Sequence, residues 1–130
     1  MLAQTKAIST IPAEDVQRAT TFYTEVLGLK KIDLGFAQNE NFPKAAFEAG
    51  EGSTVFIYQR ERTKAEHTAL TFIVDNVEET VNGLIAKGVT FEQYDFGEIK
   101  TNELGIVDMD GGRSAWLTDP EGNIISIAQV

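Results

Sequence analysis

Hydrophobic residues recur along the first half of the chain with two different spacings, which predict a strand, a helix and three further strands. Small and β-branched residues cluster over 6–11 before Pro12, which cannot continue a central strand and is expected to end this one. From Asp15 the apolar positions recur at intervals of three and four, as on one face of a helix, and Gly28 supplies the left-handed position that ends a helix. Strands are then predicted over 29–36, 44–49 and 53–59, with a polar loop over 37–43 and a turn over 50–52.

The same order of elements starts again after a polar stretch at 60–66. Residues 68–74 predict a strand, Asp75 or Asn76 is suited to cap a helix, and Gly88 closes that helix. Setting Gly52 on Gly122 aligns 53–59 with 123–129, and a one-residue gap then places Phe47 opposite Trp116. The chain is therefore predicted to be one domain over 1–130 that contains two β-α-β-β-β modules, about 6–60 and 67–130. The later elements of the second module are a strand over 89–96, a long loop over 97–112 and a hairpin of 113–117 with 123–128.

Composition excludes several classes of partner. The 130 residues include 20 acidic and 11 basic ones, and the net charge is −9. This acidic protein would repel nucleic acids and anionic membranes, so neither is expected as a partner. Cysteine is absent, which excludes disulfides and thiolate metal sites. The first residues lack the apolar core of a signal peptide, and no apolar run approaches the ~18 residues of a membrane span, so a cytoplasmic location is expected.

Three segments, at 14–30, 72–89 and 115–129, resemble parts of a known family. The first, EDVQRATTFYTEVLGLK, and the second, FIVDNVEETVNGLIAKGV, look like its two helices, and AWLTDPEGNIISIAQ looks like its closing hairpin. The chain thus resembles the vicinal oxygen chelate superfamily, which includes lactoylglutathione lyase, bleomycin resistance proteins, extradiol dioxygenases and fosfomycin resistance enzymes. The resemblance implies an α+β fold, in which two βαβββ modules form a curved mixed sheet with a cleft and with helices packed outside. It also implies a homodimer that binds a small molecule, and it leaves open whether modules pair within or between chains.

The resemblance also defines positions for a metal ion. The family's metalloenzymes hold a divalent cation with His or Glu ligands on the first and last strands of each module. In this sequence those positions fall on Ile8, Phe56, Ala69 and Ser126, none of which is a His, Asp or Glu. A site of this kind needs about three protein ligands. The sequence therefore predicts no metal site at these positions and no other cofactor.

The only histidine, His67, stands two residues before Ala69, so both side chains are expected on one strand face. An imidazole without a partner makes neither a metal site nor a catalytic dyad. A surface role, a ligand contact and an acid-base role are all open at this stage.

Strand alternation separates the side chains that pack beneath the helices from those that face a ligand. Val55, Ile57, Ile125 and Ile127 are predicted to pack beneath the helices. The opposite, concave face then combines apolar and aromatic side chains with a few hydroxyls, which is typical of small-molecule pockets, although a closed second core would use similar residues. The candidate ligand contacts are Phe56, Tyr58, Trp116, Thr10, Thr71, Ser126 and His67.

No pattern singles out a catalytic residue. Carboxylates that would serve as a general base are plentiful, but no paired spacing distinguishes one from the solvated majority. The acidic, glycine-rich part of the loop over 97–112 is expected to form a mobile flap over the cleft, and it lacks the spacing of a calcium loop. The candidate carboxylates are Glu48, Glu92, Asp95, Glu98, Asp108 and Asp110.

Three functions fit these observations. The first is a metal-free binding protein, similar to the bleomycin resistance proteins, that sequesters or carries an aromatic or cationic compound. The second is a metal-dependent lyase, isomerase or dioxygenase resembling lactoylglutathione lyase, with ligands at other positions. The third is a dimeric structural or interaction protein with a closed core. The residues leave open whether the chain is an enzyme.

Overall fold

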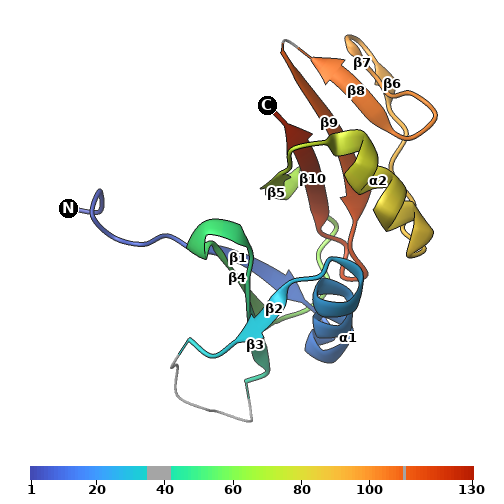
Figure 1. Ribbon diagram of the computed structural model, residues 1–130. Helices are drawn as coiled ribbons and strands as arrows, with labels where there is room; N and C mark the ends of the chain where they lie inside the picture. Colours follow the sequence, from blue (N-terminus) through green and yellow to red (C-terminus); the bar gives the residue numbers. More distant parts are fainter. Residues whose placement is uncertain (35–41, 110) are drawn as a thin grey trace. The chain divides into compact units, whose positions relative to one another are not determined.

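The computed structural model describes residues 1–34, 42–109 and 111–130 and divides the chain into two compact units, Met1–Arg62 and Thr63–Val130 (Figure 1). Each unit contains one four-stranded sheet, and unit two also contains a two-stranded hairpin. Each predicted module lies within one unit. The predicted loop over 37–43 and the end of the strand predicted over 29–36 lie largely outside the described residues.

Unit one has the predicted β-α-β-β-β order, with the strands in the sheet order β1-β4-β3-β2. β1 runs parallel to β4, and the other pairs are antiparallel. The last two strands are joined by a single 3-10 turn at Gly50–Gly52. The elements are β1 (Ser9–Ala13), α1 (Val16–Thr21), the π-helical turn η1 (Phe22–Val26), β2 (Lys30–Ile32), β3 (Lys44–Glu48) and β4 (Thr54–Gln59).

The helical segment of unit one begins and ends where the sequence predicts. The Asp15 carboxylate accepts a hydrogen bond from the backbone N–H of Arg18 at 3.0 Å, as an N-cap residue does. After Gly28 the chain leaves the helix, with a positive φ of 77° that glycine adopts without strain. The helix covers one face of the sheet, where the Tyr23 ring stacks on Phe47 with centroids 5.8 Å apart. Val55 and Ile57 are buried, which confirms that they belong to this core.

Pro12 does not end the first strand, as the sequence analysis expected, but lies inside β1 opposite Tyr58. β1 is an edge strand, at one end of the sheet order of unit one. A strand at the end of a sheet needs backbone hydrogen bonds on one side only, so it tolerates the missing N–H of proline. The rule used for a central strand therefore gave the wrong boundary.

Unit two repeats this topology, with the sheet order β5-β10-β9-β8 and a small hairpin of β6 and β7 inserted after the helix (Figure 1). The Asn76 side chain caps α2 by accepting from the Glu79 N–H at 3.0 Å. Ile125 and Ile127 are buried, as predicted. The elements are β5 (Thr68–Ile73), α2 (Val77–Ala86), β6 (Asp95–Phe96), β7 (Ile99–Lys100), β8 (Ile106–Met109), β9 (Gly112–Thr118) and β10 (Ile124–Gln129).

The sequence assigned the wrong segment to the second strand of this module, the counterpart of β2. Residues 89–96 contribute only an isolated bridge between Phe91 and Leu117 and the two residues of β6. The strand that pairs with β9 is β8, which lies inside the predicted loop over 97–112, so the predicted flap is wrong as well. Ile106 and Val107 are each only 2% exposed and anchor β8 in the sheet. Consecutive buried residues on a short strand do not alternate, and this hid β8 from the sequence pattern. Asp110 lies outside the described residues.

The internal repeat needs no gap. Phe47 pairs with Val55 in unit one, and Leu117 pairs with Ile125 in unit two. With Gly52 set on Gly122, Leu117 is therefore the counterpart of Phe47, and both side chains are fully buried. The predicted correspondence of Phe47 with Trp116 is wrong by one residue. Because neighbouring residues on a strand point to opposite faces, Trp116 lies on the face of the sheet opposite the helix.

The Asp-Pro-Glu-Gly-Asn segment forms the predicted tight turn between β9 and β10. The Asp119 carboxylate accepts hydrogen bonds from the backbone N–H groups of Glu121 and Asn123, both at 2.8 Å, and from the Asn123 side chain at 2.9 Å. Gly122 has a positive φ of 90°. One carboxylate thus orders the whole turn and sets the register of β9 against β10.

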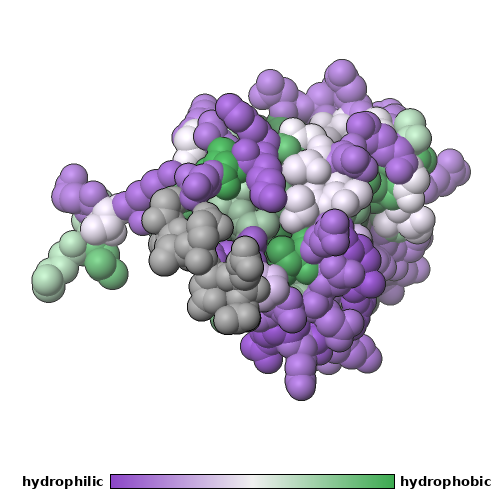
Figure 2. All heavy atoms as spheres, turned by 90° about the horizontal axis from the view of Figure 1, so that it is seen from below, coloured by the Kyte–Doolittle hydropathy of each residue, from purple (hydrophilic) through white to green (hydrophobic). Residues whose placement is uncertain are grey.

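Hydrophilic side chains predominate on the face shown in Figure 2, with smaller hydrophobic patches between them. This agrees with a net charge of −9, which favours a solvated surface. Among the described residues, no helix is both long enough and apolar enough to cross a membrane.

Candidate functional site

The opposite face, by which we mean the side of each sheet away from its helix, holds most of the predicted ligand contacts. In unit one, Thr10, Phe56 and Ala46 lie in one cross-strand row, since Thr10 pairs with Phe56 and Phe56 with Ala46. Tyr58 lies two residues further along β4 on the same side. Phe56 and Tyr58 are half-buried and Thr10 is exposed. Three of the seven predicted contacts are therefore neighbours in unit one.

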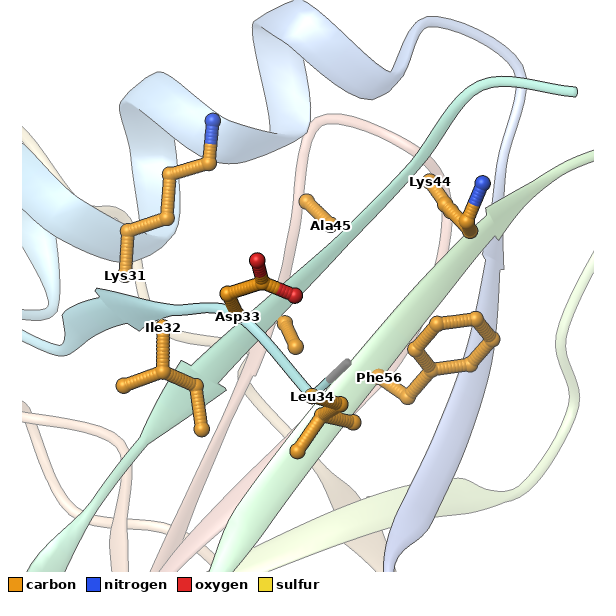
Figure 3. Close-up of a pocket in the computed structure, with 8 residues that line it drawn as sticks. Lys31, Ile32, Asp33, Leu34, Lys44, Ala45 and Phe56 are labelled. Carbon is orange, nitrogen blue, oxygen red and sulfur yellow. The ribbon is translucent and has the colours of Figure 1, made fainter. Parts of the chain in front are cut away.

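A shallow pocket of about 280 Å³ lies at the end of this row (Figure 3). Ile32, Leu34 and Phe56 contribute apolar surface to it. In Figure 3, Ile32 and Leu34 point to the opposite side from Lys31 and Asp33, as strand alternation requires. A pocket for a drug-sized molecule normally has roughly 300–1,000 Å³, so this one fits only part of a ligand. The complete lining is Lys31, Ile32, Asp33, Leu34, Lys44, Ala45, Ala46 and Phe56.

The charged groups of this pocket do not converge on one point. Lys31 and Lys44 come from opposite faces of the sheet, because Lys31 pairs with Phe47 on the helix side and Lys44 with Tyr58 on the other. The Lys44 ammonium donates to the Phe42 carbonyl at 3.4 Å. The polar rim of the pocket is therefore divided between the two faces.

In unit two, Thr71, Ser126 and Trp116 form the corresponding row on three adjacent strands. The two rows place their aromatic residue differently. In unit one the ring of Phe56 is on the last strand beside a small residue, Ala46, whereas in unit two the ring of Trp116 is on the preceding strand beside Ser126. Three further predicted contacts thus lie in one row, with Ser126 between Thr71 and Trp116.

The inserted segment adds two aromatic residues to this face, which the sequence analysis did not select. The Tyr94 ring meets Trp116 edge-on with centroids 5.5 Å apart, and it meets Phe96 at 5.7 Å in the same manner. We call Tyr94, Phe96 and Trp116 the aromatic cluster. Tyr94 and Phe96 were counted within a strand over 89–96, and only the fold of the insertion brings them to Trp116. Their spacing of two residues was the available sequence signal.

Glu92 gives this cluster an acidic neighbour. Its carboxylate accepts a hydrogen bond from the Thr118 hydroxyl at 2.8 Å, and Thr118 lies two residues from Trp116 on β9. Partial burial raises the pKa of Tyr94 above its ordinary value of 10.0, and the negative charge of Glu92 raises it further. The phenol is therefore neutral at physiological pH and available as a hydrogen-bond donor.

His67 lies apart from these rows. It is exposed and directly precedes β5. The pairing of β5 with β10 is irregular here, because Ile124 faces Thr68 whereas Ile125 already faces Leu70, which leaves Ala69 as an extra residue. Such a bulge interrupts alternation, so the predicted common face of His67 and Ala69 does not follow from the spacing.

The residues present do not fit the family's metal site. The side chains at its ligand positions are Ile8, Phe56, Ala69 and Ser126, and only the serine hydroxyl is polar. Over residues 1–34, 42–109 and 111–130, no three His, Asp or Glu side chains are grouped so that they could hold a metal ion. Aliphatic and aromatic side chains donate no lone pair to a divalent cation.

Two βαβββ modules, each with a mixed four-stranded sheet covered by a helix on one face, define the α+β class of the vicinal oxygen chelate fold. The sequence profile of the Glyoxalase/Bleomycin resistance protein/Dioxygenase superfamily matches residues 5–127, and the chain belongs to this superfamily. Its members bind small-molecule substrates.

Three solved structures illustrate the similarity in fold. UcmS2 is 20% identical, with a TM-score of 0.71, and the match covers 95% of this chain and 97% of that one. A glyoxalase family protein from Bacillus anthracis is 18% identical, with a TM-score of 0.68 and coverage of 99% and 98%. The fosfomycin resistance protein FosX from Listeria monocytogenes, in complex with Mn(II) and sulfate, is 14% identical, with a TM-score of 0.69 and coverage of 100% and 94%. A comparison with curated protein sequences finds no match.

Proposed function

We propose that this protein binds a small organic compound on the opposite faces of its sheets, without a metal ion at the family's ligand positions, and that it does so as a homodimer. The observation that carries the proposal is the row of Thr71, Ser126 and Trp116. It replaces a metal-binding position by a hydroxyl beside an indole. That combination suits a ligand with an aromatic body and polar substituents.

The corresponding row in unit one also supports binding of a small organic compound. Phe56 occupies another of the metal-binding positions and lines the 280 Å³ pocket with Ile32 and Leu34. An apolar floor with Thr10 beside it accepts a carbon skeleton and one hydrogen-bonding group. His67, exposed at the start of β5, is proposed as a peripheral contact only.

The alternative is a metal-dependent enzyme, and one observation favours it: the FosX structure that resembles this chain holds Mn(II). For this chain to do the same, its ligands would have to come from other residues than those at the matching positions. The two functions therefore differ in a measurable property, the dependence of ligand binding on a divalent cation.

The deciding experiment compares the purified protein before and after exhaustive dialysis against a chelator. Metal content is measured by mass spectrometry, and thermal unfolding is followed with a panel of neutral and cationic aromatic compounds. A compound present at 100 times its dissociation constant stabilises the folded protein by about 2.7 kcal/mol, whether or not the protein was dialysed. A stoichiometric metal ion that is present before this dialysis, and whose removal by the chelator abolishes ligand binding, contradicts the proposal.

One test variant and one control variant make this result specific. Trp116→Ala is expected to abolish the ligand-induced rise in unfolding temperature. Ile85→Ala, at a helix residue that is 41% exposed, should leave it unchanged.

The molar mass in solution, measured by light scattering, tests the homodimer separately. A monomer at all concentrations used for binding would refute that part alone.

A further inference from the structure

The inserted segment of unit two combines exposed aromatic surface with negative charge next to Trp116. We propose that the aromatic cluster recognises a positively charged organic group, a quaternary or alkylated ammonium, on the bound compound. This inference rests on the proposed function, because it presupposes that a small molecule binds to unit two. It adds Glu92, Tyr94 and Phe96 to the site and specifies the charge of the ligand.

The geometry of the three rings suits a cation. Tyr94 is at interplanar angles of 62° to Phe96 and 65° to Trp116, so the rings face in different directions. A cation is attracted to the face of an aromatic ring within about 6 Å of its centroid, and rings set at steep angles can present more than one face to it. Neighbouring rings with centroids 5.5 and 5.7 Å apart are close enough for one ammonium group to approach more than one of them.

The exposure of Phe96 is hard to explain by folding alone. It lies on the short strand β6 at the surface, and its side chain is 60% exposed. A phenylalanine in that position gains little from burial, and exposed apolar side chains that adjoin one another are typical of interaction surfaces. Tyr94, in contrast, is half-buried between its neighbours and holds the cluster together.

The local charge complements a cation. The inserted segment over 92–104 contains one basic residue, Lys100, and four acidic ones, Glu92, Asp95, Glu98 and Glu103. Asp95 and Lys100 are opposite each other in the register of the hairpin, so their charges largely cancel. Glu92 is held by Thr118 on the strand that carries Trp116. After burial, its negative charge is the second cause that raises the pKa of Tyr94.

A pair of probes with the same shape and different charge tests the inference. The probes are (3-hydroxyphenyl)trimethylammonium and its neutral analogue 3-tert-butylphenol. Trp116 is the only tryptophan, so its indole N–H gives a single side-chain signal in the NMR spectrum of the full-length protein. We expect the cation to shift this signal with a dissociation constant about tenfold lower than that of the neutral probe.

Two variants identify the groups responsible. Phe96→Leu keeps apolar bulk and removes one ring, and it should weaken binding of the cation about fivefold more than binding of the neutral probe. Glu92→Gln retains an acceptor for Thr118 and should reduce the preference for the cation about threefold. The matched controls lie in unit one. Phe42→Leu changes another exposed aromatic residue, and Glu61→Gln changes the net charge equally. Neither should alter the preference.

The possible failures separate the two proposals. Equal affinity for both probes, or a preference that Phe96→Leu leaves unchanged, overturns recognition of a cation and leaves the proposed function standing. Stabilisation by other compounds without any change in the indole signal overturns the assignment to the aromatic cluster. If no compound of the panel binds the dialysed protein, the proposed function itself is refuted.

Discussion

A Cβ atom placed on Gly105 would lie 2.9 Å from the Cβ of Phe91. The two ends of the inserted segment therefore touch, and they close it into a loop whose tip is the β6–β7 hairpin. Phe91 is in turn bridged to Leu117 in the sheet, which anchors the base of the loop. The position of the aromatic cluster thus depends on this close approach of backbone and side chain.

Gly105→Ala is expected to destabilise the protein clearly more than Gly111→Ala. Both glycines have a similar positive φ, 83° and 80°, so both substitutions carry the backbone strain of roughly 1–2 kcal/mol. At Gly105 the new methyl group also clashes with its neighbours, which adds about 1–3 kcal/mol. At Gly111 it meets no atom within 4 Å, so no such term is added. Chemical denaturation measures both values. Equal losses of unfolding free energy would show that the surroundings of Gly105 accommodate the methyl group without cost.

Phe47→Ala and Leu117→Ala should cost similar amounts, about 3–5 and 2–5 kcal/mol of unfolding free energy. The two residues occupy equivalent positions of the repeat, and each is completely buried against a helix. The measurement is again denaturation, with Ile85→Ala as the exposed control. If only one of the pair behaved as a core residue, the register of the repeat described above would be wrong.

The stability of the protein should fall above pH 10, and Tyr94→Phe should reduce that fall. The pKa of Tyr94 is raised in the folded state above the ordinary value of 10.0. As the pH rises past 10, tyrosine in the unfolded chain loses its proton before folded Tyr94 does, so the unfolded state is favoured. Unfolding curves of both proteins at several pH values between 8 and about 11 test this. Parallel pH profiles for wild type and variant would contradict it.

Ser126→Ala should weaken ligand binding about two- to tenfold, which corresponds to one neutral hydrogen bond. Thr71→Val should act in the same range, since its hydroxyl lies in the same row. Ser114→Ala is the matched control, because Ser114 is on the same face of β9, in the next row, opposite Ala128. Titration calorimetry with a compound found in the thermal screen gives the ratios. An effect of Ser114→Ala as large as that of Ser126→Ala would mean that the row is not the site.

The order of elements and several of their boundaries were predictable because they depend on neighbouring residues. The Asp15 and Asn76 caps, the positive φ of Gly28 and the turn at Asp119 each arise from contacts within four residues. The alternation of β4 and β10 likewise identified Val55, Ile57, Ile125 and Ile127 as core residues, since a strand exposes alternate side chains whatever its partners are.

The sequence by itself thus determined the α+β fold, the repeat and the lack of donors at the family's metal positions. Only the tertiary structure decided which residues meet on the opposite faces. The register of β9 against β10 places Trp116 beside Ser126. The closure of the insertion at Phe91 and Gly105 brings Tyr94 and Phe96 to Trp116. These contacts join residues ten or more positions apart, and no local pattern records them. β8 was missed for a local reason instead, because its consecutive buried residues Ile106 and Val107 do not alternate.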